Sequence, residues 1–449
     1  MKKHYTNPAS SIKNALRYVL SAGEQAAALL YLTKWLLICT LVGVLAGSAS
    51  AFFLVALDWV TTYREANTEI IWLLPVGGLL VGLLYHYYGG DANKGNNLLL
   101  EEIQKPKKVI PFLMAPLVLF GTLVTHLFGG SAGREGTAMQ MGGAIADQFT
   151  YLFRLRPRDR KVIIIAGISA GFASLFGTPL AGALFGLEVF ILGRIRYEAL
   201  LPSLMAAIIA NYTCHAWQVG HTQYDIPFVP EITLEALSLT LGAGIIFGLA
   251  GMLFSKSTYY FLSLFKKLIS YPPLRPFIGG LVVATVVWLM GTTKYIGLGI
   301  PTILSAFEEP AQWYDFLVKT FLTAFTLGAG FKGGEVTPLF YVGATLGNAL
   351  SQALPLPMAL MAGMGFVAVF SGATNTPLSC TIMSIELFGS ESAVFMALAC
   401  FTAYLFSGHT GIYGSQVIGS PKHLFYGRYK GKTLSSLTSA PNFRSKIED

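Results

Sequence analysis

Apolar segments alternate with short polar ones along most of the chain. In the first half the apolar segments cover residues 26–60, 71–88, 109–128, 139–152, 162–192 and 200–217. In the second half they cover residues 233–254, 261–269, 276–290, 316–329, 336–353, 358–370, 379–388 and 393–406. Some match a membrane-spanning helix of about 20 residues, whereas others are too short or are interrupted by Gly and Pro. Interrupted helices at membrane depth occur only where they line a cavity or are buried in protein. The pattern predicts an all-α integral membrane protein with broken helices.

A polar, Pro-containing connector divides the chain into two halves. We therefore expect a lead-in at residues 1–29, a first membrane repeat at 30–217, the connector at 218–232, a second membrane repeat at 233–428 and a polar tail at 429–449. The lead-in is polar and basic, and we expect a short amphipathic helix in it around residues 12–20. The tail is rich in Ser, Thr and charge, a composition typical of disorder.

The second half repeats features of the first. The segment Thr178-Pro179-Leu180, followed by Glu188, matches Thr376-Pro377-Leu378, followed by Glu386. Both the prolines and the glutamates lie 198 residues apart. Internal duplication with interrupted helices at matching positions indicates a transport site between two repeats. We expect Glu188 and Glu386 themselves to be structural.

A glycine-rich stretch at residues 129–137 places Arg134 and Glu135 inside a strongly apolar region. Ionisable residues at membrane depth are costly and mark functional sites. The glycines break the incoming segment and let backbone N–H groups open a new helix, whose positive end faces an anion. Glu135 is then a titratable carboxylate beside an anion site, which indicates ion transport coupled to protons. The counterpart in the second half is residues 331–338, where Glu335 lies 200 residues after Glu135.

The composition agrees with a membrane protein. Hydrophobic residues make up 53% of the chain and charged residues 12%, about half the share usual in soluble proteins. The net charge of +8 is concentrated between the apolar segments. Because basic loops usually face the cytoplasm, we expect a multi-pass protein of the plasma (inner) membrane with both termini in the cytoplasm. Basic clusters that only punctuate apolar segments argue against a nucleic-acid partner. The four cysteines lack CxxC spacing, so we expect no metal site and no cofactor.

Several separated segments resemble the CLC family of anion channels and proton-coupled antiporters. They include Gly133-Arg134-Glu135-Gly136, the glycine-rich loop that enters a helix at Pro338, and residues 407–413. The likeness covers roughly residues 30–430, and the segments follow the family's order. The resemblance implies a homodimer in a lipid bilayer with one pore in each subunit. In each subunit, two inverted-topology repeats aim helix N-termini at a central anion.

The resemblance also implies roles for single residues. Glu135 would be the external gating glutamate, whose carboxylate competes with the anion and carries a proton. The hydroxyl of Tyr413 would donate to the anion. Gly133, Gly136 and Val336 would line the anion site with their backbone groups.

The chain departs from chloride-handling members in its first anion loop. Those members carry Gly-Ser-Gly-Ile-Pro where this chain has residues 95–99, so Asn96 replaces the serine. Its neighbour Asn97 is the alternative amide for facing the ion, and the sequence does not decide between them.

Two further departures concern the proton route. The inner proton-loading glutamate of chloride antiporters is Val189 here, and the Phe of their Gly-x-Phe-x-Pro loop is Val336. Glu335 stands instead at the start of the second-repeat helix. Together with Asn96, this combination resembles the fluoride/proton antiporter branch of the CLC family.

Fluoride chemistry agrees with these residue types. Fluoride is small and strongly hydrated, so a site must replace its water with close N–H and O–H donors. Asn96, Thr337, Tyr413 and the N–H groups at helix starts are such donors. Glu335 donates only when protonated, which would link proton occupancy to fluoride occupancy.

Other residues are expected to be structural. We expect Arg134 to form a buried ion pair with Glu102, and Gly142 and Gly343 to lie at contacts between helices.

Two other functions compete with fluoride export driven by protons. The first is a chloride channel or chloride/proton antiporter of the same family, which Asn96 and Glu335 disfavour. The second is an intramembrane enzyme that pairs Ser131 with His126 or His409. Such proteases place glycine where this chain has Ala132, and they have no use for two repeats. The sequence therefore predicts a secondary transporter rather than an enzyme.

Overall fold

The computed structural model describes residues 22–438 and is mostly helical, as predicted. The α-helices are α2 (Ala22–Ala66), α3 (Leu74–Tyr88), α4 (Asn96–Gln104), α5 (Met114–Leu127), α6 (Glu135–Leu152), α7 (Pro157–Phe176), α8 (Pro179–Glu188), α9 (Leu200–Ala216), α10 (Leu234–Leu268), α11 (Leu274–Met290), α12 (Ile300–Glu308), α13 (Asp315–Gly328), α14 (Val336–Ser351), α15 (Met358–Thr374), α16 (Pro377–Phe388), α17 (Ala393–Phe406) and α18 (Leu434–Thr438). The short 3-10 helices are η1 (Thr68–Leu73), η2 (Gly90–Lys94), η3 (Tyr197–Ala199) and η4 (Leu424–Tyr429). Two short strands, β1 (Ile191–Leu192) and β2 (Val417–Ile418), pair in parallel.

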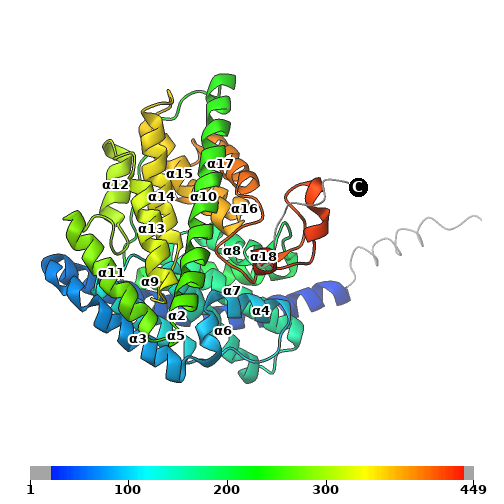
Figure 1. Ribbon diagram of the computed structural model, residues 1–449. Helices are drawn as coiled ribbons and strands as arrows, with labels where there is room; N and C mark the ends of the chain where they lie inside the picture. The colour runs from blue at the N-terminus through cyan, green and yellow to red at the C-terminus, as the bar shows by residue number, and fades with distance from the viewer. Residues whose placement is uncertain (1–21, 439–449) are drawn as a thin grey trace, which may run out of the picture.

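The two halves of the chain form two packed groups of helices. Figure 1 shows the first-half helices, coloured from blue through cyan to green, below most of the second-half helices, coloured green to orange. The groups touch where α3 packs against α11, α6 meets α14, and α8 packs against α16. The functional elements identified from the sequence therefore lie at the boundary between the halves.

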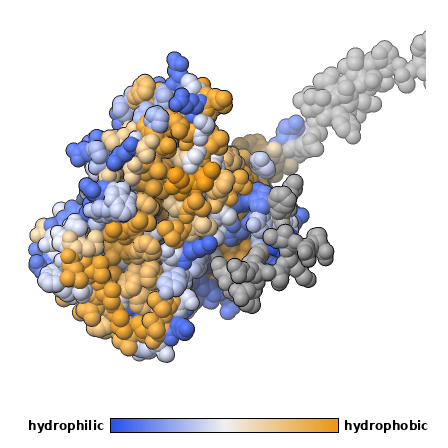
Figure 2. All heavy atoms as spheres, turned by 45° about the horizontal axis from the view of Figure 1, so that its top comes forward, coloured by the Kyte–Doolittle hydropathy of each residue, from blue (hydrophilic) through white to orange (hydrophobic). Residues whose placement is uncertain are grey.

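Much of the outer surface is apolar. Figure 2 shows broad hydrophobic areas on the visible face of the molecule. Within the described residues, four helical segments are long and apolar enough to cross a bilayer: Gln25–Ala66, Thr68–Tyr88, Tyr197–Ala216 and Leu234–Leu268. Several other apolar helices are shorter, including α5 and α17. These short helices are the interrupted segments that the sequence pattern predicts.

Glycines let paired helices approach closely at equivalent places in the two halves. A β-carbon on Gly142 of α6 would overlap the carbonyl oxygen of Gly167 on α7. Likewise, a β-carbon on Gly343 of α14 would overlap the carbonyl oxygen of Gly365 on α15. The expectation that Gly142 and Gly343 are helix-contact glycines is confirmed. Because α6 and α14 carry the candidate site at their N-termini, these contacts fix its position.

Glu188 and Glu386 each cap a helix of the other half. The Glu188 carboxylate accepts hydrogen bonds from the N–H groups of Leu378 (3.2 Å) and Ser379 (2.9 Å), at the start of α16. The Glu386 carboxylate accepts from the N–H groups of Leu180 (2.9 Å) and Ala181 (2.8 Å), at the start of α8. The first N–H groups of a helix have no partner within it, so a carboxylate from elsewhere satisfies them. The structural role expected for both glutamates is confirmed.

Several boundaries differ from the expectations. The apolar segment 162–192 contains two helices, because the chain turns at Gly177 with φ of +74° before α8 begins. The segments 233–254 and 261–269 form the single helix α10, since the polar residues between them continue the helix. The prediction of disorder after Tyr429 is wrong for residues 430–438, which are described in the structure and include the buried Leu434. The amphipathic helix expected near residues 12–20 lies outside the described residues.

The glycine contacts predict opposite effects for two Gly→Ala changes. We expect Gly343→Ala to lower the free energy of unfolding by about 1–3 kcal/mol, because the added carbon overpacks the contact with α15. Gly242→Ala on α10 meets no atom within 4 Å, and we expect it to raise the stability by about 0.5–1 kcal/mol. Thermal unfolding of both variants in detergent checks this pair. Equal stability of the two would contradict the packing account.

Candidate functional site

Backbone pairing between the two glycine-rich loops brings the halves together. The N–H of Gly133 donates to the carbonyl of Gly334 at 2.6 Å, and the N–H of Gly334 donates to the carbonyl of Gly133 at 2.8 Å. This antiparallel bridge lies directly before the starts of α6 and α14. The N-termini of two helices from different halves therefore meet at one point, as the repeat pattern predicts.

The carboxylate of Glu135 occupies the N-terminus of α14. Its side chain is fully buried and accepts hydrogen bonds from the N–H of Val336, the N–H of Thr337 (3.2 Å) and the hydroxyl of Thr337 (2.9 Å). It also accepts from the N–H of Arg134 at 2.9 Å. These donors and the helix dipole favour a negative charge at this point. Glu135 thus fills an anion position with a charge that belongs to the protein.

Glycine is required where the chain passes this carboxylate. A β-carbon on Gly334 would overlap Oε1 of Glu135, and one on Gly133 would lie 2.6 Å from the same atom. At Gly136, a β-carbon would lie 3.0 Å from Nδ2 of Asn96. The three glycines therefore leave room for the carboxylate and the Asn96 amide to approach the backbone.

A cavity of about 180 Å³ collects most of the other predicted site residues. Its walls include Asn96, Asn97, Glu335 and Tyr413. Hereafter we call it the central cavity. Glu335 directly precedes α14, and its side chain makes no capping hydrogen bond to that helix, whereas the Glu135 carboxylate does. Gly133, Val336 and Thr337 do not line this cavity and lie around the Glu135 carboxylate, and Gly136, also absent from its wall, lies against the Asn96 amide.

The two neighbouring asparagines have different surroundings. The side-chain oxygen of Asn97 accepts a hydrogen bond from the N–H of Ser415 at 2.9 Å, which ties α4 to the loop after α17. The side-chain oxygen of Asn96 is buried with no hydrogen-bond partner within the described part of the chain. Its Nδ2 atom is the one that approaches Gly136 at the start of α6. Asn97 is therefore held by the backbone of Ser415, whereas the Asn96 amide lies against the start of α6.

Tyr413 and Thr337 already have partners for their hydroxyl groups. Tyr413 is 2% exposed, and its hydroxyl lies 3.8 Å from the sulfur of Met139. A thioether is a weak acceptor, so this hydroxyl can readily turn to a better one. The Thr337 hydroxyl donates to Glu135 and so belongs to the group of donors that bind that carboxylate.

The expected ion pair between Arg134 and Glu102 is wrong. Glu102 pairs with Arg160 at 3.0 Å, and Arg160 also binds Asp147 at 2.8 Å. Glu102 lies in the last turn of α4, which packs against α7, the helix that carries Arg160. Nε of Arg134 is buried without a hydrogen-bond partner among the described residues. Sequence reasoning missed Asp147 and Arg160, although Asp147 is a charged residue inside the apolar segment 139–152 and Arg160 lies just before the next one.

The serine and histidine of the enzyme hypothesis do not pair. The Ser131 hydroxyl donates to the carbonyl of Tyr295 at 3.0 Å, and Nε2 of His126 lies 3.3 Å from the carbonyl of Gly133. Nε2 of His409 accepts from the N–H of Lys422 at 3.3 Å. These three side chains contact backbone groups, and they do not form the hydrogen-bonded nucleophile and base that such an enzyme needs.

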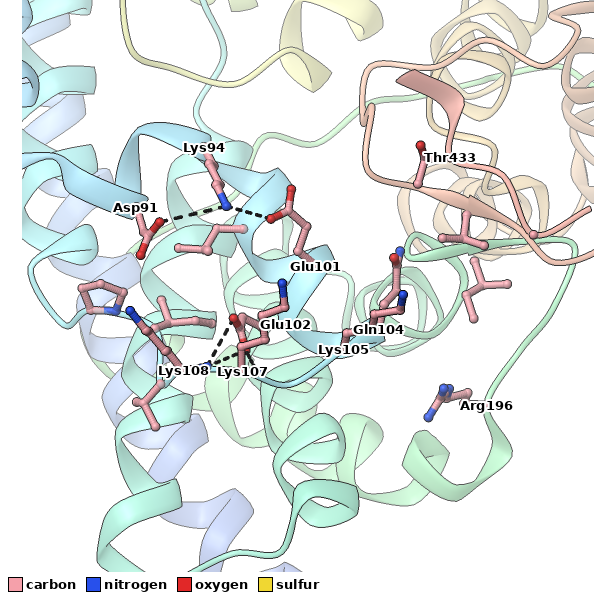
Figure 3. Close-up of a pocket in the computed structure, with 17 residues that line it drawn as sticks. Asp91, Lys94, Glu101, Glu102, Gln104, Lys105, Lys107, Lys108, Arg196 and Thr433 are labelled. Atoms are coloured by element: carbon pink, nitrogen blue, oxygen red, sulfur yellow. Dashed lines mark hydrogen bonds and ion pairs between the residues drawn. The ribbon is translucent and has the colours of Figure 1, made fainter. Parts of the chain in front are cut away.

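A second hollow adjoins the central cavity. Figure 3 shows this hollow, of about 660 Å³, with Lys105, Lys107 and Lys108 on its rim. Lys94 lines both spaces and forms ion pairs with Glu101 at 3.0 Å and with Asp91 at 4.0 Å. The central cavity therefore borders a basic surface region of the molecule.

Comparisons with known proteins agree on one family. The sequence profile described as voltage gated chloride channel matches residues 77–408. A "Chloride/fluoride channel protein" of Pseudomonas syringae pv. tomato is 56% identical over 406 residues, which cover 89% of this chain and 90% of that protein. An "H(+)/Cl(-) exchange transporter ClcA" of Vibrio vulnificus is 26% identical over 404 residues, covering 84% of this chain and 85% of its own length.

Solved structures give the same fold. A CLC-type fluoride/proton antiporter superposes with a TM-score of 0.84 at 36% identity, covering 86% of this chain and 98% of that one. A slow cyanobacterial Cl−/H+ antiporter superposes with a TM-score of 0.73 at 20% identity, covering 90% of this chain and 96% of that one, and supports the fold alone.

The ion pairs of Arg160 with Glu102 and Asp147 are expected to stabilise the fold. We expect Arg160→Met to lower the free energy of unfolding by about 3–5 kcal/mol, because it leaves the carboxylates of Glu102 and Asp147 buried without their cation. Arg158→Met changes an exposed arginine two residues away and is the matched control. Thermal unfolding in detergent measures both. Wild-type stability of Arg160→Met would show that the network is not needed for folding.

Proposed function

The chain belongs to the voltage-gated chloride channel (CLC) family, and we propose that it exports fluoride in exchange for protons. Its similarity to a chloride/fluoride channel protein and to a fluoride/proton antiporter supports this reading. The observation that carries it is the Glu135 carboxylate bound to the N-terminus of α14. A site that holds a carboxylate with those donors is chemically suited to a small anion.

Fluoride and the Glu135 carboxylate compete for the same donors. When Glu135 is protonated it loses its charge, and its hold on the N–H groups of Val336 and Thr337 weakens. A fluoride ion then takes that place and gains the same hydrogen bonds. When Glu135 releases its proton, the carboxylate returns and expels the ion. Fluoride movement past α14 therefore requires a proton on Glu135.

The central cavity supplies the second half of the cycle. Asn96 and Tyr413 present amide and hydroxyl donors to an ion in this space, beside Glu335. A deprotonated Glu335 repels a second anion, whereas a protonated one donates a hydrogen bond to it. Fluoride occupancy of the cavity and protonation of Glu335 thus favour each other, which couples the two ions on this side of the site.

The setting of the site follows from the family. The chain is a multi-pass membrane protein, and we place it in the plasma (inner) membrane as a homodimer with one pore in each subunit. The basic residues near the central cavity, among them Lys105, Lys107 and Lys108, put that side in the cytoplasm by the positive-inside rule. Glu135 then faces the outer route and Glu335 the inner one.

A chloride channel is the second candidate, because the name of the Pseudomonas syringae relative includes chloride and channel. Two residues argue against chloride as the main ion. The Asn96 amide supplies N–H donors where chloride-handling members have a serine hydroxyl, and Glu335 places a second carboxyl group on the wall of the central cavity. Fluoride gains more than chloride from close, charge-assisted donors because it is smaller.

The proposal predicts that either glutamate is required for coupling. We expect Glu135→Gln and Glu335→Gln each to reduce fluoride-driven proton movement to the level of protein-free liposomes, since glutamine cannot carry the proton. The measurement is proton uptake by proteoliposomes during fluoride efflux. Glu386→Gln makes the same chemical change at a helix cap outside the site and should keep the coupling. Wild-type proton movement in either of the first two variants would remove that residue from the mechanism.

A further inference from the structure

Lys332 is a cation on the wall of the central cavity that the proposed cycle does not use. It lies in the loop before α14, between the glycine bridge and α13. Its ammonium nitrogen is 3.9 Å from the centre of the Tyr85 ring, and both residues line the cavity. Its aliphatic stem packs against Gly121 of α5, where a β-carbon would lie 2.9 Å from Cβ and Cγ of Lys332. Gly121 on one side and the Tyr85 ring on the other hold this side chain in one place.

The charge of Lys332 is not neutralised by a carboxylate. Within residues 22–438, none of the ion pairs at 4.0 Å or less involves Lys332. Lys94, on the same cavity, behaves differently because it pairs with Glu101. Glu335 lines the cavity too, but it forms no ion pair with Lys332. The cavity therefore contains a positive charge that an arriving anion can meet.

The Tyr85 ring holds the ammonium without consuming its charge. A cation over an aromatic face is stabilised by the ring quadrupole, and its net charge remains. The N–H groups that do not point at the ring stay available as donors. A carboxylate in the same place would compete with the transported anion, as Glu135 does at α14. An aromatic partner avoids that competition.

We propose that Lys332 is the fluoride-capturing and ion-selecting residue of the central cavity. Its ammonium binds fluoride first and passes it to the donors of Asn96 and the helix starts. A lysine ammonium is a compact, strongly hydrated point charge, which matches fluoride better than it matches chloride. Hydrogen bonds from a charged donor are about twice as strong as neutral ones, and they favour the smaller ion. This inference rests on the proposed fluoride transport and adds to it the residue that selects the ion.

Two substitutions of Lys332 separate charge from shape. Lys332→Met keeps the stem but removes the charge, and we expect it to raise the KM for fluoride about tenfold or more. Lys332→Arg keeps the charge but spreads it over a planar group that matches larger anions. We expect this variant to retain fluoride transport with a lower ratio of fluoride to chloride flux. In both variants the number of protons moved per fluoride should equal that of the wild type, because Lys332 does not carry the transported proton.

The experiment measures fluoride and chloride efflux from proteoliposomes over a range of cytoplasmic-side concentrations, together with proton uptake. Lys107→Met, on the exposed rim of the neighbouring hollow, is the control for removing a lysine and should leave KM unchanged. Gel filtration and thermal unfolding establish that each variant folds. If Lys332→Met does not fold, the flux ratio of Lys332→Arg decides.

The outcomes distinguish this inference from the proposed function. Wild-type KM in Lys332→Met, or a wild-type flux ratio in Lys332→Arg, overturns the role of Lys332 and leaves fluoride exchange intact. A wild-type protein that moves no fluoride overturns the proposed function itself. Loss of proton coupling in Lys332→Met would assign the lysine to the proton route and also overturn its role as an ion-capturing residue.

Discussion

The structure depends on a carboxylate from one half of the chain bound to a helix N-terminus of the other half. The N–H groups that open α14 are buried and have no partner within their own helix, so something negative or electron-rich must satisfy them. Glu135 does so here. The same arrangement recurs at Glu188 and Glu386, which cap α16 and α8. Neither Glu188 nor Glu386 lines the two cavities described above, and their caps join the halves, whereas the Glu135 cap lies beside the central cavity.

Close backbone packing makes that interaction possible. The paired backbones of Gly133 and Gly334 set the distance between α6 and α14, and no side chain fits between them and the carboxylate. The glycine contacts behind α6 and α14 support the two helices at matching points. A binding site for a small anion requires donors that are already held in place. In a loose site the hydrogen bonds would not offset the free energy of dehydrating fluoride. The glycines at these contacts allow the backbones to approach closely enough to hold the donors in place.

Much of this arrangement could be predicted from the sequence, because the signals are local. Glycines before an ionisable residue in an apolar segment predict a helix start, and the helices do begin at Glu135 and Val336. What could not be predicted depends on contacts between distant segments. The partner of Glu102 is Arg160, 58 residues away on another helix, and nothing in the local pattern chooses it over Arg134. Asn96 and Asn97 carry identical side chains and differ only in the residues that surround them in the fold. Lys332 lies within the stretch 331–338, but the sequence could not show that its ammonium contacts the Tyr85 ring or that it forms no ion pair within the described residues.

The most direct test of fluoride/proton exchange is uphill transport by the purified protein. Liposomes with equal fluoride inside and outside receive a proton gradient, with the membrane potential clamped, and external fluoride is followed with an electrode. The account predicts that fluoride accumulates on the side with the higher proton concentration, because protons moving down their gradient drive fluoride the opposite way, and that chloride under the same conditions accumulates far less. Fluoride that stays at its equal starting concentrations whatever the pH gradient would contradict exchange and leave a passive channel.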